Sequence, residues 1–141
     1  MTATRELPAI RVGDRLPVVR PPEISRAMLA LFAGASNDHN PIHIDLDAAR
    51  DAGRPDVFAQ GMLSMAFVAR SLTAWVPQHR IRSLGARFLA ITPVHAQVEV
   101  VGEVTALVDG VATVELSVRL ADGTVTISAT AQVDTEDSSC T

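Results

Sequence analysis

The sequence contains no lysine: all twelve of its basic residues are arginine. Any anionic ligand must therefore meet an arginine, a backbone N–H group or the start of a helix. Acidic residues outnumber basic ones, and the net charge of −4 argues against a nucleic-acid-binding surface. Cysteine is almost absent as well. The single Cys140 excludes an internal disulfide, and its place near the end of a polar segment argues against a catalytic thiol.

Long hydrophobic runs are also missing. The first residues lack an apolar stretch of signal-peptide length, and no run approaches the roughly 20 residues that a membrane span needs. We therefore expect a cytoplasmic protein with no membrane partner. The 141 residues, 48% hydrophobic and 20% charged, are typical of one soluble globular domain. Its core should extend over about residues 8–133, and 134–141 should be a flexible tail.

The most unusual stretch is residues 36–45, Ser-Asn-Asp-His-Asn-Pro-Ile-His-Ile-Asp. Pro41 lacks an N–H group and pushes Asn40 out of the α region, so this stretch is predicted to be a bent loop. In such a loop Asp38 and His43 can converge, and a carboxylate beside an imidazole forms an acid/base pair that can titrate near neutral pH. The alternative is a polar turn whose Asp and Asn side chains bond their own backbone.

Three helices are predicted around this loop. The first starts at Glu23 and ends at Gly34, because apolar residues recur there at three- and four-residue steps. Its buried face should comprise Ile24, Met28, Leu31 and Phe32. Asp45 is expected to cap a short helix over Leu46–Ala52 rather than to act in catalysis. The third helix, Met62–Val76, is apolar on nearly every side, so other structure must enclose it.

Strands are predicted before the first helix and after the third. Arg15–Val19 can form a short strand, and the pairs Asp109-Gly110 and Asp122-Gly123 are hairpin signals. The later strands are expected at Ile81–Leu89, Val94–Val108, Val111–Leu120 and Val125–Val133. Long antiparallel strands that follow one buried helix predict an α+β domain whose sheet curls around that helix.

Five short motifs follow one another along the chain: Val12-Gly13-Asp14, Leu31-Phe32-Ala33, Asp38-x-Asn40-Pro41-Ile42-His43-x-Asp45, Gly61-Met62-Leu63 and Arg87-Phe88-Leu89. In this order they resemble the MaoC-type dehydratase/(R)-specific enoyl-CoA hydratase family. The resemblance extends from about residue 8 to residue 133. It implies a hot-dog fold, no cofactor, and a homodimer or a heterodimer with active sites near the subunit interface.

The resemblance also implies a reaction. Water would add to the double bond of a trans-2-enoyl thioester, carried by coenzyme A or a carrier protein, or would be lost in the reverse direction. Asp38 and His43 match the catalytic pair of the family. As water attacks C3, negative charge collects on the thioester oxygen, and the backbone N–H groups of Gly61 and Met62 are suited to stabilise it. Asn40 would orient the water or fix the turn.

Four further residues are candidates for the site. Gln60 stands where these hydratases often have histidine. Because its amide can hydrogen-bond but cannot titrate, any role must be positional. Arg54, Arg82 and Arg87 are the candidates for contacts with substrate phosphates, against the alternative of solvated surface side chains.

A metal site made of Asp38, His39 and His43 is disfavoured. Pro41 disrupts the helical spacing that two-histidine zinc sites often use. His39 is instead expected to point to solvent, and no metal is expected.

Three functions fit the sequence. The first is an (R)-specific enoyl thioester hydratase or 3-hydroxyacyl thioester dehydratase. The second is a hot-dog thioesterase, in which a carboxylate and water hydrolyse the thioester. The third is a non-catalytic subunit of a heteromeric dehydratase, against which the intact Asp38 and His43 argue.

Overall fold

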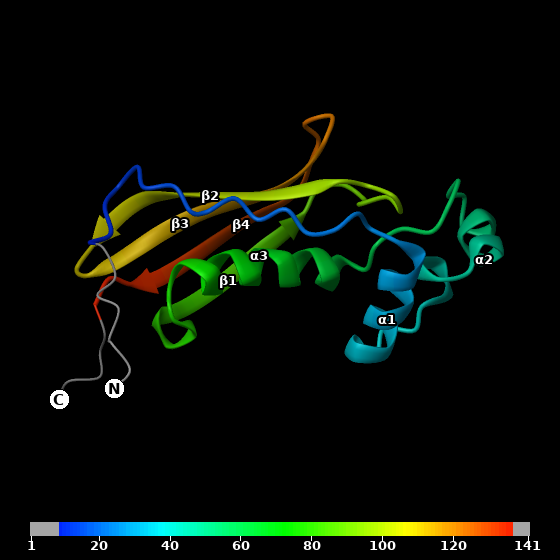
Figure 1. Ribbon diagram of the computed structural model, residues 1–141, viewed down its shortest axis with the longest axis horizontal. Helices are drawn as coiled ribbons and strands as arrows, with labels where there is room; N and C mark the ends of the chain where they lie inside the picture. Colours follow the sequence, from blue (N-terminus) through cyan, green and yellow to red (C-terminus); the bar gives the residue numbers. More distant parts are fainter. Residues whose placement is uncertain (1–8, 137–141) are drawn as a thin grey trace.

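A four-stranded antiparallel sheet folded against one long helix forms the body of the molecule (Figure 1). The computed structural model describes residues 9–136. The strands are β1 (Ile81–Phe88), β2 (Val98–Val108), β3 (Val111–Leu120) and β4 (Val125–Asp134), in the spatial order β1-β4-β3-β2. Helix α3 (Gly61–Trp75) contacts all four strands. The predicted α+β fold with a central helix is therefore confirmed.

The core lies between α3 and the inner face of the sheet. Successive side chains of a strand point to opposite faces, so every second residue of β3 faces the helix. These residues are Ala112, Val114, Leu116 and Val118, all buried. Leu63, Phe67, Val68 and Leu72 meet them from α3. Burial of each large apolar side chain contributes about 1.5–3 kcal/mol, which makes this layer the main source of stability.

The two predicted hairpins are confirmed. Asp109 and Gly110 have φ angles of 49° and 76°, which place both central residues in the left-handed region that a tight β2–β3 turn requires. Gly123 has a φ of 89° in the β3–β4 turn. β2 begins at Val98 and not at Val94 as predicted, because His95, with a φ of 67°, turns the chain just before it.

The two edges of the sheet differ. The N-terminal segment covers the β2 edge through bonds such as Leu16 N to Gly102 O (2.9 Å) and Val19 N to Val100 O (3.1 Å). The predicted strand over Arg15–Val19 is reduced to isolated bridges. Pro17 has no N–H group to continue a ladder. At the other edge, β1 pairs only with β4 within the part of the chain that the structure describes.

Helix α1 (Arg26–Ser36) begins and ends later than predicted. Ser25 caps it by accepting the N–H group of Met28 at 3.1 Å, as serine commonly does. Asn37, with a φ of 60°, ends it, because asparagine tolerates the left-handed conformation that stops a helix. Gly34 therefore lies inside the helix and does not end it.

The predicted buried face of α1 is wrong in part. The face turned to the core comprises Met28, Leu29, Phe32 and Ala33. Ile24 is buried but precedes the helix, and the side chain of Leu31 is 76% exposed. A helix advances 100° per residue, so the face fixed by residues 29 and 33 turns residue 31 outward.

Helix α2 (Leu46–Asp51) starts where predicted and ends one residue early. Asp45 Oδ1 accepts the N–H groups of Asp47 at 2.9 Å and Ala48 at 3.4 Å, so its predicted role as an N-cap is confirmed. α2 lies beyond the end of the sheet, near α1 (Figure 1). Its neighbour is the short 3₁₀ helix η1 (Pro41–His43).

The expectation that α3 is enclosed on every side is wrong for a single chain. Its side toward the sheet is buried, whereas Met62 is 58% exposed and Ala66 and Arg70 lie on the same open side. The sheet curves around only part of the helix, so an apolar stripe of α3 stays uncovered.

The predicted tail begins too early. Asp134 belongs to β4, and Thr135 donates its N–H group to Gly110 O at 2.9 Å. Residues 1–8 and 137–141, including Cys140, lie outside the described residues. Within 9–136, no helix is long and apolar enough to cross a membrane.

Candidate active site

The loop between α1 and α2 has the bend that its proline predicts. Asn40 is extended (φ −58°, ψ 121°), and the chain then turns through η1. Asn40 Oδ1 accepts the N–H group of Ile42, and Asp38 Oδ1 accepts that of Asn40, both at 3.3 Å. The turn-fixing role considered for Asn40 is therefore observed.

Asp38 and His43 converge in this loop, as predicted. His43 Nε2 lies 3.8 Å from Asp38 Oδ2. The imidazole side chain is 9% exposed and the carboxylate 42%, so the pair lies where the loop opens to the surface. Asp38 Oδ1 accepts the Asn40 N–H group of the turn, whereas Oδ2 faces His43. The polar turn and the acid/base pair, considered as alternatives from the sequence, are therefore both present.

The backbone of Phe58 fixes the orientation of His43. His43 Nδ1 lies 2.7 Å from Phe58 O, and the two rings meet edge to face with centroids 4.9 Å apart. A carbonyl oxygen only accepts hydrogen bonds, so we assign the hydrogen of the neutral imidazole to Nδ1. The lone pair of Nε2 then faces Asp38. Sequence reasoning missed Phe58 because its contribution is a main-chain carbonyl, which any residue type has.

Two hydrogen-bond acceptors therefore face each other across 3.8 Å, too far apart for a direct hydrogen bond. A water molecule can donate one hydrogen to Nε2 and the other to the carboxylate. Its oxygen would then carry an unengaged lone pair, which is the condition for a water nucleophile activated by a general base.

The start of α3 presents free N–H groups. Within the described part of the chain, no acceptor bonds the N–H groups of Gly61 and Met62, and both residues are exposed. A Cβ at Gly61 would lie 2.9 Å from Cε1 of Phe88, so a larger residue here would have to displace the exposed Phe88 ring. Helix starts favour negative charge, which suits these groups to bind a developing oxyanion.

Gln60 is fully buried and links two helices. Its Nε2 donates to the backbone oxygen of Leu29 in α1 at 3.0 Å. Its Oε1 is buried and has no donor among residues 9–136. Gln60 is also the N-cap residue of α3, although its side chain does not cap the helix.

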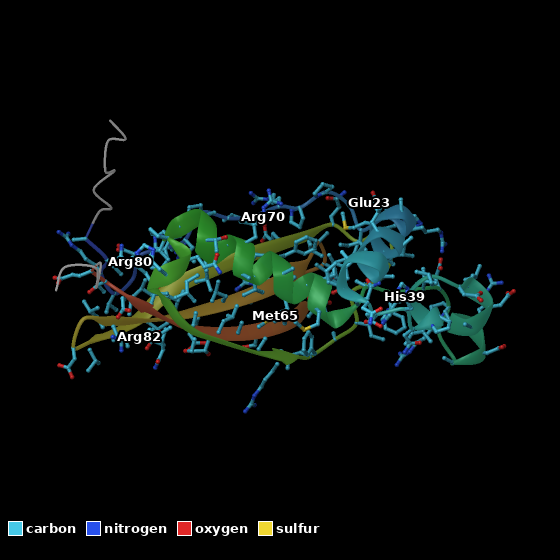
Figure 2. All side chains as sticks on the ribbon, turned by 90° about the horizontal axis from the view of Figure 1, so that it is seen from below. Glu23, His39, Met65, Arg70, Arg80 and Arg82 are labelled. Carbon is cyan, nitrogen blue, oxygen red and sulfur yellow. The ribbon has the colours of Figure 1, made fainter. Side chains whose placement is uncertain are left out.

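Of the three arginines predicted to bind substrate, the structure brings one to the pair. The guanidinium carbon of Arg54 lies 6.0 Å from the centroid of the Phe58 ring. Arg82 lies at the end of the molecule opposite His39 (Figure 2) and pairs with Asp134 at 2.6 Å, so within one chain it lies away from the Asp38–His43 pair. Arg87 precedes Phe88, which packs toward α3, so strand alternation turns Arg87 to the outer face.

Asp38, His39 and His43, whose grouping as metal ligands the sequence disfavours, do not form a metal-binding cluster in the described residues. Within residues 9–136, no three His, Cys, Asp or Glu side chains are grouped to hold a metal ion. His39 is exposed, as expected.

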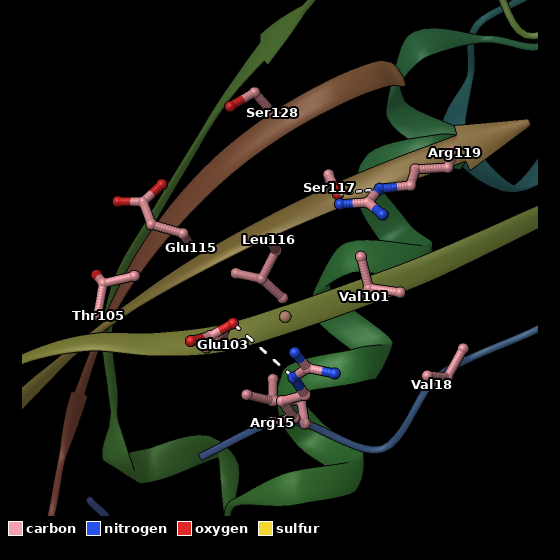
Figure 3. Close-up of a pocket in the computed structure, with 12 residues that line it drawn as sticks. Arg15, Val18, Val101, Glu103, Thr105, Glu115, Leu116, Ser117, Arg119 and Ser128 are labelled. Carbon is pink, nitrogen blue, oxygen red and sulfur yellow. Dashed lines mark hydrogen bonds and ion pairs between the residues drawn. The ribbon is translucent and has the colours of Figure 1, made fainter. Parts of the chain in front are cut away.

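Two hollows on the surface lie apart from the pair. One of about 520 Å³ lies on the outer face of the sheet, where Glu103 and Glu115 are register partners and Arg15 lies 3.9 Å from Glu103 (Figure 3). An apolar hollow of about 470 Å³ runs along α1 and reaches Leu63 of α3, with Leu31 in its lining. Neither hollow is lined by Asp38 or His43, so neither encloses the candidate site.

Comparison with known proteins defines the class. A helix laid on a curled antiparallel sheet, with the loop pair at one end, is the hot-dog fold of a MaoC-like hydratase or dehydratase. The family model described as "MaoC like domain" matches residues 11–125. The chain therefore belongs to the MaoC-like dehydratase family.

Individual relatives agree with this assignment. Over 83 residues the chain is 34% identical to the 3-oxo-4,17-pregnadiene-20-carboxyl-CoA hydratase beta subunit of Mycobacterium tuberculosis (strain ATCC 25618 / H37Rv). That match spans 58% of this chain and 64% of the relative, which is just under two thirds of its length. The fold is similar to a chain in the ChsH1-ChsH2 complex from M. tuberculosis (TM-score 0.80, 29% identity, 88% and 97% of the two chains). It also resembles the (R)-hydratase from A. caviae involved in PHA biosynthesis (TM-score 0.81, 24% identity, 90% and 98%).

Proposed function

We propose that this protein is an (R)-specific enoyl thioester hydratase, or in reverse a 3-hydroxyacyl thioester dehydratase. The observation that carries the proposal is the Asp38–His43 pair. Its two acceptors face each other across 3.8 Å, and the proton-bearing Nδ1 of His43 is held by Phe58 O. Family membership supports the same class of reaction.

The chemistry follows from these positions. The pair binds a water molecule through its hydrogens and takes one proton as the water oxygen bonds to C3. The π electrons of the C2–C3 bond move toward the thioester carbonyl, whose oxygen gains negative charge. The N–H groups of Gly61 and Met62 stabilise that charge. Return of the proton to C2 completes the hydration, and no other reactant is needed.

The substrate is a thioester on a phosphate-bearing carrier, coenzyme A or an acyl carrier protein. Arg54 supports this part of the proposal. Its guanidinium lies over the Phe58 ring, beside His43, and among residues 9–136 no carboxylate forms an ion pair with it. Arginine can bind a phosphate through two parallel hydrogen bonds.

The functional unit is a homodimer in this proposal. β1 leaves one edge of the sheet without a partner in the described chain, and unpaired edges are commonly covered in native proteins. Phe88 and Leu89 at the end of β1 are more than half exposed, and the Phe88 ring packs against Gly61 at the start of α3. A second subunit there would also cover the end of the molecule that carries Asp38 and His43.

A second candidate is a subunit of a heteromeric hydratase. It is favoured by the relatives, one of which is named a beta subunit, whereas another similar chain belongs to a two-component complex. In that case the chain alone would have little activity and would need a different partner chain.

The test is to give the purified protein a short trans-2-enoyl-CoA and follow double-bond absorbance together with free thiol. Loss of absorbance without thiol release is the expected result. Release of thiol would instead support a thioesterase. Absence of both changes, in a folded protein, would contradict the hydratase and favour the heteromeric subunit.

A further inference from the structure

Gln60 is a buried side chain that joins the two halves of the candidate site. Helix α1 leads directly to Asp38, and α3 begins with the exposed N–H groups of Gly61 and Met62. Gln60 immediately precedes Gly61, and its Nε2 donates to Leu29 O in the first turn of α1. One side chain thus spans from the helix that delivers the carboxylate to the helix that presents the N–H groups.

The other end of the same amide is unfavourable for stability. Gln60 Oε1 is buried without a donor among the described residues. A buried acceptor without a partner loses its hydration and gains nothing in return. Leu29 lies inside α1, where its carbonyl oxygen also serves the hydrogen bonding of the helix itself. Core packing alone therefore does not require glutamine at this position, because an apolar side chain of similar length would leave no buried oxygen unpaired.

We propose that Gln60 is a positioning residue for the hydration reaction, kept at a cost in stability. Through its bond to Leu29 it fixes the distance between the water held by Asp38 and His43 and the N–H groups that receive the charge. This inference rests on the proposed function. Its physical basis is that a small displacement between a nucleophile and its oxyanion donors lowers the rate strongly while binding changes little.

The discriminating variant is Gln60→Met, which keeps the length of the side chain and removes both polar atoms. We expect its Tm to equal or exceed that of the wild type, kcat to fall at least about tenfold, and KM to change by less than about threefold. Gln60→His, which keeps an N–H donor for Leu29 O, should recover most of the lost turnover. Ser71→Ala is the matched control, because Ser71 is also buried in α3 without a hydrogen-bond partner in residues 9–136 but lies at the opposite end of the helix from Gly61.

A second measurement does not depend on activity. Amide hydrogen exchange at Leu63, whose N–H group donates to Gln60 O at 3.1 Å, should become faster in Gln60→Met and stay unchanged in Ser71→Ala, because only the first variant releases the start of α3 from α1.

Each outcome decides between the alternatives. A Gln60→Met protein with wild-type kcat, or with kcat lost only together with Tm, would overturn the positioning role. If that variant does not fold, Gln60→His decides: a folded His variant with kcat within about fivefold of the wild type supports the role, and a larger loss overturns it. An inactive wild-type protein with the predicted exchange pattern would contradict the proposed function and leave the link between α1 and α3 established.

Discussion

Asp38 and His43 are held in place by different groups, so their replacement should differ in its effect on stability. Asp38→Asn keeps an oxygen that can accept the Asn40 N–H group, and its Tm should stay near that of the wild type. His43→Ala leaves Phe58 O without its donor and removes a ring contact, which should cost about 1–3 kcal/mol.

Both substitutions should nevertheless lower kcat by at least about a hundredfold, the usual contribution of an acid/base group. Steady-state kinetics with a trans-2-enoyl-CoA and thermal denaturation of each variant measure the two effects. His39→Ala is the control, since His39 is exposed beside the pair. An Asp38→Asn variant that hydrates at a near-normal rate would refute the catalytic assignment.

Replacing Arg54 tests whether the phosphate-bearing carrier of the substrate binds near Asp38 and His43. Arg54→Gln should raise KM for an enoyl-CoA about tenfold and leave kcat nearly unchanged, because it removes a contact made equally by substrate and transition state. The same enoyl group on N-acetylcysteamine, which has no phosphate, should show no change. Arg87→Gln, on the outer face of the sheet, is the matched control. Equal loss with both thioesters would mean that Arg54 acts on His43 through Phe58 and not on the carrier.

At the scale of the elements, an ion pair ties the start of α1 to the loop before α3. Arg26 binds Asp56 through two hydrogen bonds of 2.9 and 2.7 Å. This guanidinium, together with the N–H group of Val57, holds the pKa of Asp56 below its usual value. A carboxylate with a lowered pKa in the folded state stabilises the protein above its unfolded pKa of about 3.9, and this stabilisation is lost as pH falls through the folded value.

Asp56→Asn should therefore lower Tm at pH 7, and the difference from the wild type should shrink as pH falls below the unfolded pKa of about 3.9, because the Asp56 carboxylate becomes protonated as pH falls through its lowered folded pKa. Thermal denaturation across this range measures it. Asp51→Asn is the control, since Asp51 is an exposed acid of α2 with no ion pair among the residues described. A Tm difference that persists unchanged at low pH would show that the carboxylate charge is not what holds these elements together.

Most helices, hairpins and turns could be predicted from the sequence, whereas some of their ends could not. Periodicity and turn residues found the helices, the hairpins and the bend at Pro41, because these features depend on neighbours along the chain. The predicted end of α1 at Gly34 is wrong because Gly34 and Asn37 can both stop a helix. Which of the two residues ends the helix depends on packing. The convergence of Asp38 and His43 was predictable from one proline, but the main-chain carbonyl of Phe58 has no signature in the sequence.

The positions of Arg82 and Arg87 and the enclosure of α3 could not be predicted from neighbours along the chain. The sequence names Arg82 and Arg87 as candidates for phosphate contacts because they are arginines. Within one chain, however, Arg82 pairs with Asp134 at 2.6 Å and Arg87 lies on the outer face of β1. The expected enclosure of α3 failed because the sheet of one chain covers only part of the helix. Both depend on the path of the sheet, which local sequence patterns do not encode.

For the whole molecule, the open β1 edge and the uncovered stripe of α3 lead to the last prediction. Two copies paired through β1 would form one continuous sheet and bury Phe88, Leu89 and Met62, which are now more than half exposed. We expect sedimentation at about 10 µM to give twice the chain mass of 15.0 kDa.

Leu89→Asp, which places a charge beside this edge, should shift the protein to monomer. Leu107→Asp should not, because Leu107 is an exposed leucine of β2 at the other side of the sheet. Since the candidate site is open in one chain and neither hollow encloses it, the monomeric Leu89→Asp protein should also lose most of its hydratase activity while it stays folded. A fully active monomer would mean that one chain completes the site, and the β1 edge would then need another explanation.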